Sequence, residues 1–294
     1  MIIAVASGKG GTGKTTIATN LVLSLEGSVR LLDCDVEEPN AHLFLKPRIE
    51  STTSIGIPVP CVDELRCTAC GKCGQICQYS AIVALKTKPL TFPELCHGCG
   101  GCARICPSGA ITEVSREIGT LEKGRSGNVE FVHGRLKIGE AMSPPLIRAV
   151  KKYIRQEGAT IIDAPPGTSC PVIATVKDSD FVILVTEPTP FGLNDLMLAV
   201  EMIRELGTPF GVLINRADLG DDRVRDYCRA QGIQVLLEIS NDRKIAEAYS
   251  KGILMIEVRP GLIDTFRELY ARIGDIVSSG GSKGLPYSSE KGEI

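Results

Sequence analysis

The chain alternates short apolar runs with segments whose apolar residues recur at helical spacing. Strands are expected in the apolar, partly β-branched runs at residues 2–6, 29–32, 159–163, 181–186, 210–216 and 234–239. Helices are expected at residues 16–25, 145–156, 192–206, 221–231, 242–251 and 262–277. Strands that alternate with helices build a doubly wound α/β fold around a mostly parallel sheet. The pattern therefore predicts one large α/β domain.

This pattern is interrupted between residues 58 and 118, where cysteine and glycine become frequent. Eight of the 12 cysteines in the chain lie between Cys67 and Cys106. We therefore expect a discontinuous α/β domain of residues 1–57 and 119–277, with a small α+β domain inserted at residues 58–118. Such a dense, patterned set of cysteines favours metal binding over disulfides in a protein of the cytosol.

Two further segments have clear local patterns. Within residues 119–139, a turn of Gly, Arg, Ser, Gly and Asn separates two strand patterns and predicts a hairpin. Residues 278–294 are rich in Gly, Ser and Lys and predict a flexible tail.

Bulk composition narrows the class of protein only a little. The 294 residues are 43% hydrophobic, which is enough to form a substantial core. Because 33 basic residues nearly balance 35 acidic ones, the net charge of −2 gives no reason to expect a nucleic-acid partner. The first residues lack a signal-peptide pattern, and no apolar run is long enough to span a membrane. We expect a cytoplasmic protein without a membrane segment.

A glycine-rich loop joins the first expected strand to the first expected helix. Residues 8–15 match the pattern G-x4-G-K-[ST], whose glycines let backbone N–H groups converge on phosphate oxygens. Lys14 would reach the terminal phosphates, and the Thr15 hydroxyl would bind Mg²⁺. The alternative is a glycine-rich turn without a ligand. The residues expected to bind a nucleotide here are Gly8, Lys9, Gly10, Gly11, Thr12, Gly13, Lys14, Thr15 and Thr16.

The additional lysine in this loop gives it a family resemblance. Residues 9–15 resemble the deviant Walker A motif, K-G-G-x-x-K-[ST], of MinD, ParA, Mrp-type and nitrogenase-iron-protein-like ATPases. The resemblance implies that Lys9 crosses a homodimer interface, or one with a paralogue, and stabilises charge on the phosphates of the partner's ATP. Lys9, Lys14 and Asp35 are then the expected catalytic residues.

The same resemblance gives roles to two acids and to an Asn-Arg pair that follow expected strands. Asp33 and Asp35 follow the second strand, and Asp35 matches the switch I acid that orients the attacking water. Asp163, before Pro-Pro-Gly, matches the Walker B acid and would place Mg²⁺ together with Thr15. Asn215 and Arg216 match an Asn-Arg pair near the adenine. The alternatives are acids and turn residues that merely end strands.

The cysteines form a duplicated pattern. Two runs with the spacing C-x2-C-x2-C-x3-C begin at Cys67 and at Cys96. Three cysteines at this spacing can surround a cubane, while the fourth ligates the other cluster. One 4Fe-4S cluster would take Cys67, Cys70, Cys73 and Cys106, and the other Cys77, Cys96, Cys99 and Cys102. A pair of zinc sites is the alternative.

The segment resembles a bacterial two-cluster ferredoxin. Because it carries six basic and five acidic side chains, we do not expect charge attraction to dock its partner.

The remaining cysteines, Cys34, Cys61, Cys170 and Cys228, fall outside the duplication. Lone cysteines commonly act as small buried apolar residues, and we expect that role for them.

The folded chain as a whole resembles a MinD-superfamily P-loop ATPase with an inserted two-cluster ferredoxin domain. This resemblance implies an Mg²⁺-dependent ATPase that acts as a dimer. The first hypothesis is that ATP gates electron transfer through two 4Fe-4S clusters to a redox partner. The second is an assembly or carrier ATPase that delivers clusters to an apoprotein, and the third is a positioning ATPase with structural clusters.

Overall fold

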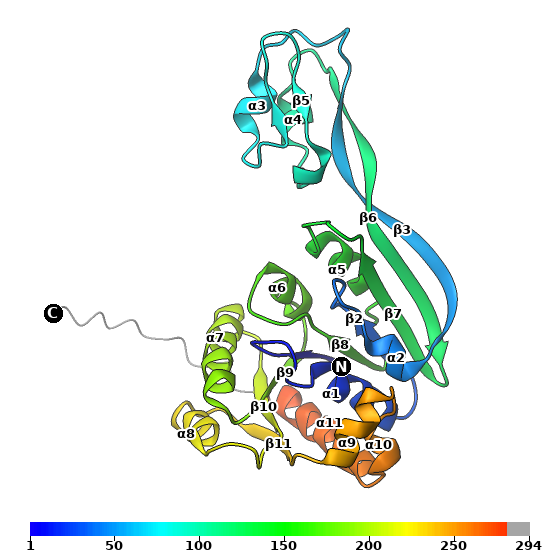
Figure 1. Cartoon of the computed structure of the whole chain (residues 1–294), viewed down its shortest axis with the longest axis vertical. Coiled ribbons are helices and arrows are strands. Elements are labelled where there is room, and N and C mark those ends of the chain that lie inside the picture. The colour runs from blue at the N-terminus through cyan, green and yellow to red at the C-terminus, as the bar shows by residue number, and fades with distance from the viewer. Residues whose placement is uncertain (281–294) are drawn as a thin grey trace, which may run out of the picture.

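One nine-stranded sheet organises the chain, with the strand order β11-β10-β9-β1-β8-β2-β7-β6-β3 (Figure 1). The structure is a computed structural model that describes residues 1–280. Every pair from β11 to β7 is parallel, so the predicted mostly parallel α/β sheet is confirmed. The parallel strands are β1 (Ile2–Ala6), β2 (Val29–Asp33), β7 (Val129–Leu136), β8 (Ala159–Asp163), β9 (Phe181–Thr186), β10 (Phe210–Asn215) and β11 (Val235–Ile239).

Helices cover both faces of this sheet. One face packs on α1 (Lys14–Ser24), α2 (Ala41–Leu45), α9 (Arg243–Ser250), α10 (Met255–Val258) and α11 (Leu262–Ser278). The other packs on α5 (Pro144–Lys151), α6 (Cys170–Val176), α7 (Pro190–Leu206) and α8 (Arg223–Ala230). Fully buried residues such as Ile17 and Phe266 on the first face, and Leu146 and Val200 on the second, form two separate cores. Burial of each such side chain contributes about 1.5–3 kcal/mol.

The last two strands of the sheet are unusually long. The antiparallel pair β3 (Arg48–Val62) and β6 (Ile111–Ser126) is bonded along nearly its whole length. Only the Gly119–Ser126 half of β6 also pairs with β7, which confirms the predicted hairpin. The other half continues beyond the sheet as a free two-stranded ribbon, residues 56–62 of β3 against residues 111–117 of β6 (Figure 1). A register shift at Ile118 marks the point where the ribbon leaves the sheet.

The end of this ribbon carries the cysteine region, which we define as residues 63–110. Its elements are α3 (Lys72–Ile76), β4 (Ile82–Val83), β5 (Leu90–Thr91), a 3₁₀ turn at Pro93–Leu95 and α4 (Gly101–Ile105). The expected insert boundaries at residues 58 and 118 fall inside β3 and β6. β3 was not foreseen, because its exposed polar residues lack the apolar alternation of a half-buried strand.

Other differences from the expected elements are small. Helix α5 ends at Lys151, five residues before the expected end, and the short helices α6 and α10 were not foreseen. Ser278 belongs to α11, while residues 281–294 of the expected flexible tail lie outside the described residues. Among residues 1–280, no helix has both the length and the apolar character needed to cross a membrane.

Candidate functional site

The glycine loop turns directly from β1 into α1, as the sequence predicts. Gly13 caps the helix with a left-handed backbone, φ +99°, that other residues rarely adopt. A Cβ atom at Gly13 would lie 2.6 Å from Asn215 Nδ2, so the close approach of β10 also requires glycine. The first N–H groups of α1 have no partner within the helix and bear its partial positive charge. The loop therefore has the geometry of a phosphate-binding site.

A cleft of about 500 Å³ opens above this loop. Nine of the residues expected in the nucleotide site line it: Gly10, Gly11, Gly13, Lys14, Thr15, Thr16, Asp35, Asn215 and Arg216. Gly8, Lys9 and Thr12 lie in the loop but outside the lining. The opposite wall, including Asn241, Asp242 and Tyr249, was missed. A usable signal existed, because residues 240–242 follow β11 and parallel strands end at the same edge of a sheet.

Thr15 and Asp163 meet beneath the cleft. The Thr15 hydroxyl donates a 2.6 Å hydrogen bond to Asp163 Oδ2. Asp163 is fully buried, and its Oδ1 has no hydrogen-bond partner among the described residues. An orphaned carboxylate oxygen beside a hydroxyl is a donor set that suits Mg²⁺. The two residues expected to place Mg²⁺ are thus adjacent and fit that role.

Three carboxylates crowd around this point. Burial raises the pKa of Asp163 to about 7, although its bond from Thr15 and the charge of Lys14 oppose the rise. Burial also raises the pKa of Asp35 to about 6, again against Lys14. The pKa of Asp33 is raised well above its usual value by burial and by Asp163. Burial therefore disfavours the charged forms of these three acids when no ligand is bound, and a bound cation would favour them.

Asp33 shapes the segment that carries Asp35. Its Oδ1 accepts the backbone N–H of Asp35 at 3.1 Å, and its Oδ2 accepts that of Ala41 at 3.1 Å. Both ends of residues 35–41 are thereby fixed to the end of β2. Asp33 thus positions Asp35 at the cleft.

A row of ionisable side chains continues from Asp33 across the sheet. The strand register places Asp163 beside Asp33, Asp33 beside His133, and His133 beside Glu122. Directly paired residues project from the same face of a sheet. The ring of His42 in α2 packs 5.3 Å from that of His133. The row therefore connects the nucleotide site with β6, the strand that leads to the cysteine region.

Asn215 and Arg216 close another side of the cleft. The Asn215 amide donates to Thr12 O at 2.9 Å and accepts the Arg216 N–H at 3.0 Å. Both polar groups of Asn215 are thus bonded to backbone, and base recognition by this amide stays a prediction. Arg216 donates to Glu187 at 2.6 Å, and Lys9 Nζ lies 4.0 Å from the other Glu187 oxygen. Lys9 therefore faces a carboxylate of its own chain.

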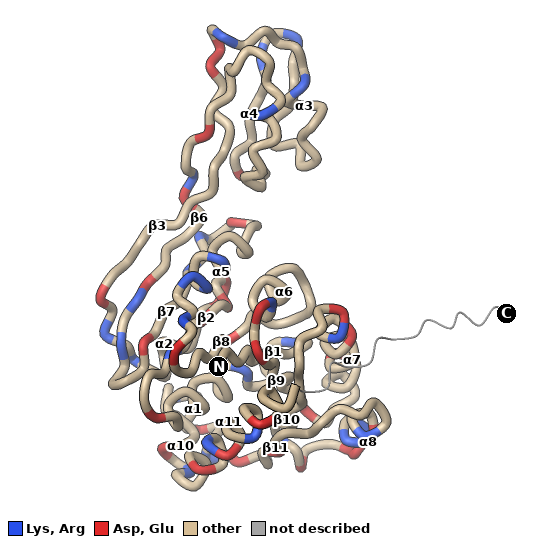
Figure 2. Tube along the Cα trace, turned by 180° about the vertical axis from the view of Figure 1, so that it is seen from behind, with Lys and Arg blue, Asp and Glu red and all other residues tan. Residues whose placement is uncertain are grey.

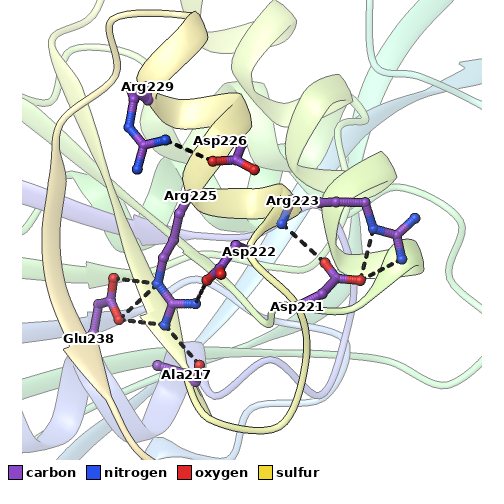
Figure 3. Close-up of polar contacts among 8 residues, drawn as sticks. All are labelled: Ala217, Asp221, Asp222, Arg223, Arg225, Asp226, Arg229 and Glu238. Atoms are coloured by element: carbon purple, nitrogen blue, oxygen red, sulfur yellow. Dashed lines mark hydrogen bonds and ion pairs between the residues drawn. The ribbon is translucent and has the colours of Figure 1, made fainter.

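Surface ion pairs stabilise the loop that follows Arg216. Figure 3 shows Arg225 of α8 bonded through two nitrogens to Glu238 of β11 and through a third to Asp222. Arg225 also donates to the Ala217 carbonyl at 2.9 Å. These bonds hold the chain just after β10 against α8 and β11.

In the cysteine region, each predicted quartet lines its own cavity. The cavity that we call the outer cavity is lined by Cys67, Cys70, Cys73 and Cys106. The inner cavity is lined by Cys77, Cys96, Cys99 and Cys102. The fourth cysteine of each run thus joins the first three of the other run. Within residues 1–280, no three His, Cys, Asp or Glu side chains are placed to hold a single metal ion.

Backbone N–H groups point at several of these thiols. Ala110 N lies 3.3 Å from Cys106 Sγ, and Gly98 N lies 3.4 Å from Cys96 Sγ. Burial alone would raise the pKa of Cys77 and Cys106, but hydrogen bonds, mainly from nearby backbone, lower both. Hydrogen bonds to sulfur stabilise the thiolate, the form that binds metal. The quartets therefore fit the ligands of an iron–sulfur cluster.

The four other cysteines divide into two groups. Cys34 and Cys228 are buried, as expected for small apolar residues. Cys61 and Cys170 are exposed, and for them the expectation was wrong.

The glycine loop between β1 and α1 of a parallel sheet, with its lysine and its buried Thr15–Asp163 pair, defines a P-loop nucleotide-binding protein. Comparison with known families agrees. Residues 3–255 match the CobQ/CobB/MinD/ParA nucleotide-binding domain, and the chain belongs to that family.

Relatives and solved structures extend this result. The chain is 32% identical over 283 residues to the protein MJ0578 of Methanocaldococcus jannaschii, covering 94% of this chain and 98% of that one. It is 27% identical to an iron-sulfur cluster carrier protein of Aquifex aeolicus, covering 85% of this chain and 60% of that protein. The septum site-determining protein MinD of Pyrococcus horikoshii, solved with Mg-ADP, shares the fold at 19% identity, with a TM-score of 0.58. That alignment covers 97% of this chain and 98% of the MinD chain.

Proposed function

We propose that this protein is an ATP-hydrolysing iron–sulfur protein in which the nucleotide controls electron transfer through two 4Fe-4S clusters to a partner. One observation carries the proposal: two separate cavities, each lined by four cysteines in the crossed pairing, stand on a ribbon that is continuous with the sheet of a P-loop domain. The fold supplies the nucleotide switch, and the ribbon connects it to the redox region.

The nucleotide site has a residue for each step of phosphoryl transfer. The N–H groups of the glycine loop and Lys14 would hold the phosphates, and Thr15 with Asp163 would hold Mg²⁺, which neutralises charge on the phosphate oxygens. Asp35 lines the cleft and would orient the attacking water. Lys9 would stabilise charge on the phosphates of a second copy in a homodimer, or of a paralogue in a heterodimer.

The cysteine region suits clusters better than zinc. Zinc needs four ligands that converge on one ion with Zn–S distances of about 2.3 Å. Here the thiols instead surround cavities, and backbone N–H groups point at the sulfur atoms. Such N–H groups are among the features that set the reduction potential of a bound cluster. Each cluster would supply one-electron redox chemistry.

Iron and sulfide analysis of anaerobically purified protein tests the proposal. We expect about eight iron atoms per chain, the content of two 4Fe-4S clusters. A Cys106→Ser variant should lose the outer cluster. The matched control is Cys61→Ser, because Cys61 is exposed and lies outside both quartets, and this variant should keep both clusters. Low-potential EPR signals that change on addition of Mg-ATP would support ATP-gated electron transfer. Stoichiometric zinc, or EPR signals insensitive to ATP, would contradict it.

A second function, delivery of clusters to an apoprotein, is favoured by the relatives. Iron-sulfur cluster carrier proteins of Aquifex aeolicus and Pyrococcus furiosus match this chain at 27% and 25% identity. A carrier should lose its clusters to an acceptor apoprotein, and an electron donor should retain them through repeated reduction. Counting the iron left on the chain after incubation with an apo-ferredoxin separates the two functions.

A further inference from the structure

The two cysteine cavities lie at different positions along the ribbon. The inner cavity contacts the ribbon at Pro60 and Glu113, and Cys96 Sγ lies 3.9 Å from Pro58 O. The outer cavity contacts it only at Ile111, the first residue of β6. The outer cavity therefore contacts the ribbon closer to the tip, on the side away from the nucleotide domain.

Basic side chains gather around the outer cavity. Lys72 lines it. Lys86 directly follows the lining residue Leu85, and Lys88 directly precedes the lining residue Pro89. Arg66 donates to the carbonyl of Ser108, another lining residue, at 3.2 Å. Figure 2 shows Lys and Arg positions along the part of the chain that carries α3 and α4.

Few acidic groups neutralise this face. Asp63 accepts the backbone N–H groups of Leu65 and Arg66, and Glu64 pairs with Lys88 at 2.7 Å. Lys72 and Lys86 form no ion pair with any residue from 1 to 280. The inner cavity differs, because Glu113 lines it and Tyr79 stacks on His97 beside it, with ring centroids 3.4 Å apart. The nearly balanced charge of residues 58–118 is thus unevenly distributed, because Arg66, Lys72, Lys86 and Lys88 outnumber Asp63 and Glu64 around the outer cavity.

The same face exposes apolar side chains. Leu65 is 99% exposed and Leu85 is 45% exposed, and the cluster ligand Cys70 is also exposed. Apolar contacts surrounded by charge are typical of small transient interfaces, where charge speeds association and orients the partner.

We propose that this basic face, formed by Arg66, Lys72, Lys86 and Lys88 around the outer cavity, is the docking surface for an acidic electron-carrier protein. The proposal rests on the proposed function, because it assigns the outer cluster as the one that exchanges electrons with the carrier. In each transfer one electron moves between the carrier's redox centre and the outer cluster. One centre is oxidised as the other is reduced, and no bond forms or breaks.

Binding of an acidic bacterial two-cluster ferredoxin, used as the probe, tests this surface. The full chain is purified anaerobically, and Kd is measured by calorimetry at low and at high salt. We expect binding that weakens as salt rises, and a loss of at least about tenfold in the double variant Lys72→Glu/Lys86→Glu. The matched control Lys152→Glu/Lys177→Glu makes the same charge change at the residues that directly follow α5 and α6, and it should bind like the wild type. Basic cytochrome c should not bind.

Iron content and the visible spectrum are recorded for every variant before binding is measured. Intact clusters with salt-independent binding, or equal loss in both double variants, would overturn the docking surface alone. Wild-type protein that assembles no clusters would overturn the proposed function and the docking surface with it. If the protein bound a cluster-accepting apoprotein and did not bind the ferredoxin, the basic face would not be a docking surface for an electron carrier.

Discussion

His133 Nε2 lies 2.7 Å from Glu122 Oε2, and this pair joins the nucleotide half of the sheet to the strand that leads to the cysteine region. His133 is 1% exposed and its Nδ1 has no partner among the described residues. On its other side lies Asp33, which fixes both ends of residues 35–41. Asp33, His133 and Glu122 thus form a row of neighbouring side chains from the end of β2 to β6.

The His133–Glu122 pair predicts a specific loss of stability in acid. Burial lowers the pKa of His133, although Glu122 opposes this shift. Below about pH 6.5 the unfolded chain binds more protons at this histidine, so the free energy of unfolding decreases as pH falls. In Glu122→Gln the imidazolium loses its partner, and we expect an additional loss of about 1–2 kcal/mol between about pH 7 and pH 5. Urea unfolding at several pH values measures it.

The matched control for this prediction is Glu201→Gln, which removes an exposed carboxylate on α7. Its stability should follow the wild-type pH profile. Parallel profiles for Glu122→Gln and the wild type would contradict the assigned role of the pair.

The buried acids predict the opposite pH dependence. Because the pKa of Asp163 is raised to about 7, the native state holds more protons than the unfolded chain from about pH 4 to pH 7. Stability of the nucleotide-free protein should fall as pH rises through this window. Asp163→Asn should therefore stabilise it by about 1–3 kcal/mol at alkaline pH, with no gain in acid, while abolishing Mg²⁺-dependent ATP hydrolysis. Thermal unfolding at both pH values, together with an ATPase assay, checks this.

Asp226→Asn serves as the control, since Asp226 is exposed on α8 and pairs with Arg229. It should leave both the stability profile and the hydrolysis rate unchanged. Failure of Asp163→Asn to stabilise the alkaline protein would show that burial does not disfavour the charged form of Asp163.

A buried ion pair between β2 and β7 should matter more for stability than any surface pair. Arg30 Nε and Nη2 each donate to Glu130 Oε2 at 3.0 Å, and both side chains are almost fully buried. Glu130→Gln should cost about 3–5 kcal/mol, because it leaves the Arg30 charge uncompensated. Glu247→Gln removes the exposed partner of Arg243 and should cost no more than about 0.5 kcal/mol. Equal losses in denaturant titrations would contradict this ranking.

The parts that could be predicted from sequence are those with local causes. The glycine loop follows from seven or eight consecutive residues, and the acids Asp35 and Asp163 follow from the rule that parallel strands end at one edge. The crossed cysteine pairing follows from short-range spacing, and each quartet does line one cavity. The pairing of β3 with β6 joins residues some 50 to 75 positions apart along polar strands, so no local pattern marks it. The His133–Glu122 contact depends on the register of the β6–β7 hairpin, and the sequence predicts that hairpin without its register.

Lys9 gives the fourth prediction. In this structure it faces Glu187 of its own chain, so engagement of a second copy requires it to leave that carboxylate. The specific ATPase rate should rise with protein concentration, and Lys9→Ala should lower the rate about 100-fold and remove the concentration dependence. Lys152→Ala, changed at an exposed lysine of the same chain, should behave like the wild type. A dimeric site would be excluded if Lys9→Ala kept the wild-type ATPase rate and if that total rate rose in direct proportion to enzyme concentration.

For the proposed electron transfer, the ribbon beyond Ile118 has the geometry of a lever arm between the sheet and the cysteine region. Its seven residue pairs at about 3.3 Å each make an arm of about 20 Å, so a rotation of about 10° at the register shift would swing its far end by about 4 Å. Electron tunnelling weakens steeply with distance. A small adjustment of β6 within the sheet would therefore be magnified into a large change in transfer rate at the tip, without any rearrangement of the cysteine region itself.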